Sequence, residues 1–381
     1  MGRRTSLVAL LVVGTGLVIA GHALLWARLV QDVGLSPAIE RALSWTLVGL
    51  AASIPVGVIT SRLVPPRWAR WWIVPVYYWI GAATLLLCSV VTVDLVCVAL
   101  GPVPAHARAS TALVLGVGAS IVAAIEGRVV RIVRVEVVLH KLPSALDGLR
   151  IVQISDLHIG PTLGRRFVER TVATVDGLAP DIVAITGDLV DASVRDIGYD
   201  VAPLARLTPR YGTYFVTGNH EYHAGADAWC EHLGTLGIHV LRNASVAIEH
   251  GGHVLHVAGV DDDEAARDGG GTDLDAAIAG CDPRRALVLL AHQPRAIHEA
   301  VRRGVDLQLS GHTHGGQLWP VAWLMRLGQP LVAGLARFGE TSLYVSCGTG
   351  HSGPPMRLGA PAEITELVLR SRACGPTRGR R

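Results

Sequence analysis

The 381-residue chain has few charged residues and almost no net charge. Asp, Glu, Lys and Arg together make up 17% of it, and the formal net charge is +3. This small charge gives no argument for a nucleic acid or another anionic partner. The six cysteines form no CxxC pair, and two of them lie inside apolar segments, so neither a zinc knuckle nor a disulfide framework is predicted. Reduced, buried thiols are expected instead.

Apolar residues are what the chain has in excess. Half of its residues are hydrophobic and its mean hydropathy is +0.40, which is too apolar for a protein that is soluble throughout. The excess lies in the first 127 residues, whereas Asp, His, Arg and Gly return at ordinary frequencies from about Arg128 onward. The sequence therefore predicts a membrane anchor over residues 1–128, a soluble domain over 129–369 and a basic tail over 370–381.

Four segments of the anchor are apolar enough to be membrane-spanning helices. They are Leu7–Ala27, Leu43–Ile59, Trp71–Val93 and Ser110–Ile125, and the third could continue through Asp94 to Leu100. The second and fourth are short for a span, so a count that differs by one stays open. We expect about four transmembrane helices, with the lipid bilayer as a partner.

Arginines are distributed unequally between the two sides of this anchor. One side carries Arg3, Arg4, Arg62, Arg67, Arg70, Arg128, Arg131 and Arg134, and the other carries Arg28, Arg41 and Arg108. The richer side is predicted to be cytoplasmic. With four spans, both termini and the soluble domain of this multi-pass protein are expected on the cytoplasmic side of the cell membrane. A secretion signal is less favoured, because no small-residue cleavage site follows the first apolar run.

From Val129 onward, short β-rich runs alternate with helical runs, which predicts an α/β fold. The expected strands lie at 129–140, 149–156, 181–188, 213–220, 253–260, 285–292, 306–312, 341–348 and 362–370, and helical runs lie at 167–178 and near 201–207. No internal repeat is present.

Several of these strands end in side chains that bind metals. They are Asp156 and His158 in SDLH, Asp188 in GD, Asn219, His220 and Glu221 in GNHE, His292 in AH, and His312 and His314 in GHTHGG. Side chains at the carboxyl ends of strands in an α/β sheet converge on one crevice. Divalent ions of the Mn, Fe or Zn kind accept carboxylate oxygen together with imidazole nitrogen, and a shared aspartate can bridge two of them.

Asp156 and His158 are two residues apart, a spacing that places side chains on opposite faces of a strand. They can share a metal ion only if the chain leaves the strand at Ser155 or Asp156. The same argument applies to His312 and His314, which are flanked by glycines that permit sharp turns.

The order of these motifs along the chain resembles that of the calcineurin-like metallophosphoesterases. The motifs are D-x-H, G-D, G-N-H-E, H and G-H-x-H. The resemblance covers about Arg150 to Leu369, and the GHTHGGQ form with its apolar N-terminal segments is similar to the membrane-associated bacterial branch. It implies a sandwich of two β-sheets flanked by helices, preceded here by the membrane helices. It also implies two divalent metal ions, whose identity among Mn, Fe, Zn, Ni and Co stays open.

The resemblance also implies a role for each motif residue. The first metal ion would be held by Asp156, His158, Asp188 and His314, and the second by Asp188, Asn219, His292 and His312, with Asp188 bridging them. His220 would contact the substrate phosphate and stabilise or protonate the leaving oxygen, while Glu221 would orient it without touching the metal.

The implied reaction is hydrolysis of a phosphodiester, phosphomonoester or pyrophosphate bond by hydroxide that the two ions activate. A membrane tether favours a lipid-linked substrate. A nucleotide or cyclic nucleotide phosphodiesterase is an alternative, and so is a non-catalytic membrane sensor that uses the same domain as a receptor. A nuclease is less favoured, because the C-terminal tail is the only basic cluster and would equally suit anionic lipid.

The stretch Trp319–Leu335 is apolar and directly follows the last metal motif. One interpretation is a buried helix and turn that pack on the sheet. The other is a lip that touches the bilayer or an acyl chain, with Trp319, Trp323 and Met325 as contacts. The sequence leaves both open.

Overall fold

The computed structural model describes residues 2–101 and 103–372, and the chain divides into two units. Unit 1 consists of residues 1–128 together with Gly353–Leu358, and unit 2 consists of residues 129–352 and 359–381. Most of the predicted basic tail, from residue 373 on, lies outside the described residues. Each unit is described separately below.

Unit 1 is built from long apolar helices. These are α1 (Gly2–Trp26), continued by the π-helical turn η1 (Ala27–Gln31), α2 (Pro37–Ser61), α3 (Pro66–Leu100) and α4 (Ala105–Glu126). Pro37 and Pro66 open α2 and α3, where proline costs no hydrogen bond and has a suitable φ. Within the described residues, four helices are long and apolar enough to cross a membrane. The short second and fourth predicted spans are therefore longer than expected, and the third continues to Leu100.

Apolar packing and one charged group join the helices of unit 1. Leu25 of α1 packs with Leu86 and Val90 of α3 in a buried cluster. In η1, the Arg28 guanidinium lies 2.9 Å from Oδ2 of Asp94 in α3. The other carboxylate oxygen of Asp94, Oδ1, lies 3.7 Å from Arg108 of α4. Asp94 is thus an ion-pair partner for two arginines from other helices.

A segment distant in sequence also belongs to unit 1. Gly353–Leu358 lies between two strands of unit 2 but groups with the helices. The backbone N–H of Arg357 donates to the carbonyl of Ala123 near the end of α4, at 2.8 Å. The chain therefore passes between the units three times, after Arg128, after Ser352 and after Leu358.

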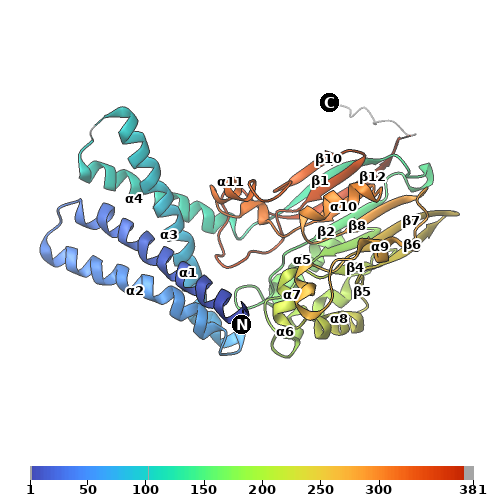
Figure 1. Cartoon of the computed structure of the whole chain (residues 1–381), viewed down its shortest axis with the longest axis horizontal. Coiled ribbons are helices and arrows are strands. Elements are labelled where there is room, and N and C mark those ends of the chain that lie inside the picture. The colour runs from blue at the N-terminus through green and yellow to red at the C-terminus, as the bar shows by residue number, and fades with distance from the viewer. Residues whose placement is uncertain (1, 102, 373–381) are drawn as a thin grey trace. The chain divides into compact units, whose positions relative to one another are not determined.

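Unit 2 contains two six-stranded sheets, which appear as two layers in Figure 1. The first has the order β1 (Val130–Leu139), β12 (Ala362–Ser371), β2 (Arg150–Ile154), β3 (Ile182–Thr186), β4 (Thr213–Val216) and β5 (His239–Val240). The second has the order β10 (Gly334–Phe338), β11 (Thr341–Val345), β9 (Leu307–Ser310), β8 (Ala286–Leu290), β7 (His253–Gly259) and β6 (Ala244–His250). Strands β2 to β5 are parallel, and so are β7, β8, β9 and β11.

Three apolar clusters show why the sheets stack and why helices cover them. Ile151 and Ala184 from the first sheet and Val257 and Leu309 from the second share one cluster, so these faces pack against each other. Because strand side chains alternate, the neighbouring residues point outward and need cover. That cover comes from α5 (Arg165–Gly177), α6 (Val194–Val201) and α8 (Ala226–Thr235) on the first sheet, and from α9 (Leu274–Ile278) and α10 (Ile297–Arg302) on the second.

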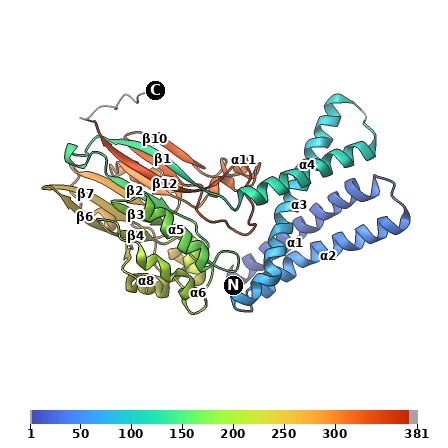
Figure 2. The ribbon, with the colours of Figure 1, turned by 180° about the vertical axis from the view of Figure 1, so that it is seen from behind.

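Seen from the two sides, α9 and α10 cover one layer in Figure 1 and α5 covers the other in Figure 2. Of the remaining helices, α7 (Asn219–Ala224) carries the residues of the GNHE motif, and α11 (Val321–Met325) follows the GHTHGG motif. The arrangement confirms the predicted α/β sandwich of two sheets flanked by helices. The described cysteines are free, as expected, but Cys347 alone among them is buried, so the prediction of buried thiols was wrong for the others.

Candidate metal centre

The motif side chains leave the sheets through tight turns at the ends of β2, β3, β4, β8 and β9. Strand β2 ends at Ile154, and the chain then adopts left-handed φ angles of 54° at Asp156 and 47° at His158. Asp188, His312 and His314 also have positive φ, at 49°, 71° and 51°. Such angles are strained for residues other than glycine and cluster at functional sites. They let residues two apart in sequence point into the same crevice.

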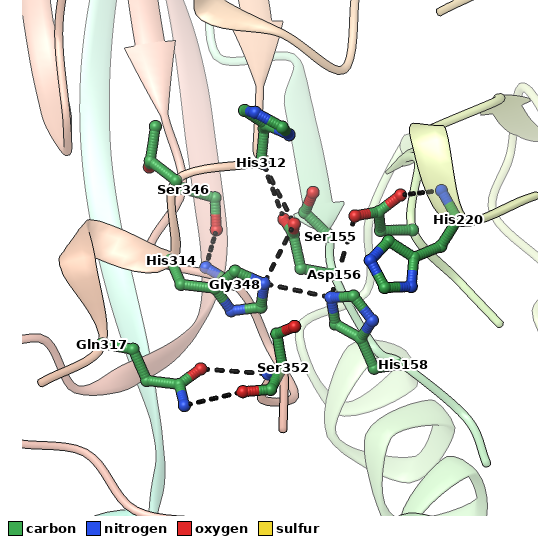
Figure 3. A network of polar contacts seen from close by, with 12 residues as sticks. Ser155, Asp156, His158, His220, His312, His314, Gln317, Ser346, Gly348 and Ser352 are labelled. Atoms are coloured by element: carbon green, nitrogen blue, oxygen red, sulfur yellow. Dashed lines mark hydrogen bonds and ion pairs between the residues drawn. The ribbon is translucent and has the colours of Figure 1, made fainter. Parts of the chain in front are cut away.

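Asp156, His158 and His314 form the first group of donors. Their ligand atoms lie within 4.8 Å of one another, and Figure 3 shows the three side chains turned toward each other. The Nε2 atoms of the two histidines are 3.0 Å apart, and His314 Nε2 is 3.4 Å from Asp156 Oδ1. Two imidazole nitrogens and a carboxylate converging in a buried site are a donor set that suits a divalent ion.

Asp188, His292 and His312 form the second group, and Asn219 lies beside them. His292 Nε2 lies 3.3 Å from Asp188 Oδ2, and the Asn219 Oδ1 atom lies 3.1 Å from His312 Nδ1 and 3.3 Å from His292 Nε2. The other ring nitrogen of His292 donates to the carbonyl of Thr186, at 2.8 Å. That bond fixes the ring so that Nε2 points into the group.

Asp188 lies between the two groups. Its Oδ2 atom is 3.3 Å from His292 in the second group and 3.8 Å from His158 in the first. Its Oδ1 atom accepts from the backbone N–H of His220, at 2.9 Å. Gly218 makes this approach possible, since a Cβ atom there would collide with the Asp188 carboxylate. All seven residues predicted as metal ligands are thus brought into one site.

His220 lies beside the first group and is partly exposed, with 32% of its side chain accessible. Its Nδ1 atom is 2.7 Å from Oδ1 of Asp191, and the same oxygen is 2.8 Å from Nδ1 of His158. One carboxylate oxygen therefore orients both a metal-ligand candidate and the predicted proton donor. The ring of His220 stands edge-on to that of His158, with centroids 4.5 Å apart.

Glu221 is fully buried and holds the backbone of two loops. Its carboxylate accepts from the N–H groups of Gly218, Asp188, Leu189 and Val190, at 2.6 to 3.2 Å. These bonds fix the turn after β3 against the turn after β4. The ring of His220 bonds to Asp191 instead. Glu221 therefore acts on His220 through the backbone of the two loops.

Comparisons with known proteins agree with this geometry. A family model described as calcineurin-like phosphoesterase matches residues 149–316. The uncharacterized metallophosphoesterase of Aquifex aeolicus is 36% identical over 236 residues, which cover 61% of this chain and 88% of that protein. The chain belongs to the calcineurin-like metallophosphoesterase family.

Other relatives of this metallophosphoesterase come from animals and bacteria. A Danio rerio protein named "Transmembrane protein with metallophosphoesterase domain" is 43% identical over 250 residues, which cover 63% of this chain and 57% of that protein. The uncharacterized metallophosphoesterase YkuE of Bacillus subtilis is 30% identical over 239 residues, covering 60% of this chain and 82% of that protein. The chain thus spans little more than half the length of the Danio rerio relative.

The electrostatics of the metallophosphoesterase site suit bound cations. Burial would lower the pKa of His158, but Asp191, Asp188 and Asp156 raise it to about 9. Burial would also lower the pKa of His292. Asp188 and Asp156 nevertheless raise that pKa well above the ordinary range. Burial raises the pKa of Asp156, with His292 acting against it. The protons held by these imidazole and carboxyl groups thus lie where divalent ions can bind in their place.

Sequence reasoning missed Asp191. It lies three residues after Asp188 in GDLVD, where an aspartate is an ordinary turn residue. Burial would raise its pKa, but His158 and His220 hold it well below the ordinary range, so it carries a negative charge. The only signal in the sequence was a second acidic residue close to a predicted ligand.

Asp191→Asn keeps the size of the side chain but removes the charge between two histidines. Burial lowers the pKa of His220, while Asp191 and Asp188 raise it, so the variant should lower that pKa. We expect metal affinity or turnover to fall about 10- to 100-fold, and the alkaline limb of the pH–rate profile to move to lower pH. Asp196→Asn, on the exposed side of α6, is the matched control. An unchanged profile would argue against a role for Asp191.

Metal binding should release protons. Because the pKa of His158 is about 9 without metal, its ring is protonated near neutral pH and must lose that proton before it can bind an ion. The apparent affinity for Mn²⁺ is therefore expected to rise as the pH increases from about 6 to about 8. Titration of the chelator-treated protein in weak buffer, with a pH indicator, measures both effects. A constant affinity over this range would contradict the assignment.

Proposed function

We propose that this metallophosphoesterase hydrolyses a phosphoester with two divalent metal ions. The observation that carries the proposal is the position of Asp188 Oδ2, which lies 3.3 Å from His292 Nε2 and 3.8 Å from His158 Nε2. One ion would be held by Asp156, His158, Asp188 and His314, and the other by Asp188, Asn219, His292 and His312. The donor set contains no thiolate, as expected for a site that binds hard or borderline ions.

The residues of the chain divide the chemistry between them. When bound, the two ions would lower the pKa of a coordinated water and neutralise charge on the phosphate oxygens. His220 faces the same crevice, and its raised pKa favours the protonated ring. As the phosphorus–oxygen bond breaks, His220 can give its Nε2 proton to the leaving oxygen. Asp191 holds the ring at Nδ1 and stabilises its positive charge.

A lipid-linked phosphoester or pyrophosphate is the substrate class that we favour. Four helices of unit 1 are suited to cross a bilayer, and only residues 127–129 separate α4 from β1. A tether this short keeps the domain at high effective concentration near membrane-bound substrates. Nucleotides and cyclic nucleotides are the competing substrates, and a sensor without turnover is the competing function.

Full-length protein in nanodiscs should hydrolyse bis(p-nitrophenyl) phosphate after metals are removed with a chelator and then restored. His220→Ala is expected to lose about 10²-fold or more in rate and to retain its metal ions. Asp188→Asn should lose both the metal ions and the activity, because Asp188 contributes to both groups. Metal content by elemental analysis separates the two defects.

His239→Ala is the matched control, since His239 is exposed on β5 and should leave the rate unchanged. If the wild-type protein binds two ions but shows no turnover with any metal, the sensor becomes the leading function. Competition by lipid phosphoesters and by nucleotides against the chromogenic substrate then distinguishes the substrate classes.

We also propose that unit 2 faces the cytoplasm from the cell membrane. Four spans place both termini on one side, and the arginine-rich connections, including Arg62, Arg67 and Arg70 between α2 and α3, favour the cytoplasmic side. A green fluorescent protein fused after Arg381 in a bacterial host should fluoresce, and alkaline phosphatase fused at the same place should be inactive. The reverse result would show the opposite orientation.

A further inference from the structure

Residues 319–327, which we call the apolar lip, expose large hydrophobic side chains in unit 2. The exposed fractions are 46% for Trp319, 64% for Trp323, 69% for Leu324 and 85% for Leu327, and α11 at its centre has no buried residue. No other nine-residue segment in the described part of unit 2 exposes as many large apolar side chains. The buried helix considered from the sequence is therefore ruled out.

The base of the lip is fixed beside the metal site. Gln317 exchanges two hydrogen bonds of 3.0 Å with the backbone of Ser352, as Figure 3 shows. At the other end, the buried hydroxyl of Thr313 donates to the carbonyl of Val332, at 2.6 Å. Gly316 packs so closely on the backbone of Ala322 in α11 that a Cβ atom would collide with it. The loop that carries His314 thus supports the lip directly.

The composition of the lip fits one kind of surface. Tryptophans concentrate at membrane–water interfaces, where their rings meet both apolar chains and polar headgroups. Arg326 is exposed between Leu324 and Leu327, and no acidic residue occurs between His312 and Glu340. An exposed apolar tip with a positive charge and no negative charge is complementary to a bilayer with anionic headgroups.

Chain connections keep such a surface within reach. Residues 127–129 join α4 to β1 and can span at most about 10 Å. The chain also enters unit 1 at Gly353, directly after the Ser352 that Gln317 holds. A domain tethered in this way cannot move far from the membrane, whereas a second copy of the chain would have to be found by diffusion.

We propose that the apolar lip inserts into the headgroup region of the bilayer and holds the mouth of the metal site at the membrane surface. Trp319 and Trp323, whose rings meet edge-to-face with centroids 6.4 Å apart, form its aromatic part, and Leu324 and Leu327 reach the acyl chains. One consequence rests on the proposed function: the phosphoester would be drawn from the membrane, with its phosphate at headgroup level.

Quenching by brominated lipids tests the insertion without requiring turnover. Full-length protein is placed in nanodiscs made of lipids whose acyl chains carry bromine close to the headgroup. The fluorescence of Trp323 is obtained by subtracting the fluorescence of the Trp323→Phe variant from that of the parent protein. Trp45→Phe serves as the lipid-exposed reference, since Trp45 on α2 is 75% exposed, and Trp229→Phe as the buried reference, since Trp229 on α8 is fully buried.

We expect the Trp323 signal to be quenched to an extent similar to that of Trp45, and the Trp229 signal to stay unquenched. In Leu324→Ser/Leu327→Ser protein, the quenching of Trp323 should decrease. The proposal would be overturned if Trp323 were quenched no more than Trp229 while Trp45 was quenched. That result would mean that water or a second chain covers the lip in place of lipid. Because quenching does not depend on hydrolysis, a failure of the proposed activity leaves this result interpretable.

Discussion

The site depends on turns that the backbone would not adopt by itself, and the buried carboxylate of Glu221 is what holds two of them. Its four backbone hydrogen bonds join the loop that carries Asp188 to the loop that carries His220. Burial and the nearby Asp188 raise the pKa of Glu221 to about 7, so the fold bears an electrostatic cost there. Charge-assisted bonds offset that cost, and strained φ angles persist because the surroundings determine them.

A second constraint is that acidic and imidazole groups share a nearly dry space. Asp156, His158, Asp188 and His292 are all buried, and isolated charges in such a place would be strongly disfavoured. Each carboxylate therefore lies beside imidazoles, and the whole set is balanced either by protons or by metal ions. The same crowding places Asp188 between two donor groups and gives His220 a charged partner in Asp191.

Much of the architecture followed from the sequence, for identifiable reasons. Strands such as β3 and β8 are fully buried and appear as short continuous apolar runs, and their terminal motifs marked the ligands. The three missed strands, β5, β6 and β10, lie at sheet edges, where partial exposure removes that signal. The division of the ligands into two groups came from the family resemblance. Asp191 was missed because its importance lies in spatial neighbours that the local sequence does not show.

Apolarity itself was ambiguous at one place, and the reason is physical. Removal of apolar surface from water is favourable whether a protein core or a bilayer receives it, so the composition of Trp319–Leu335 could not distinguish a buried helix from a membrane contact. The exposure of α11 excludes the buried helix. Gln317 and Thr313 fix the base of the lip, while the side chains of Trp323 and Leu327 are exposed on unit 2. A rigid base under an exposed apolar tip keeps that tip available for a surface outside the domain.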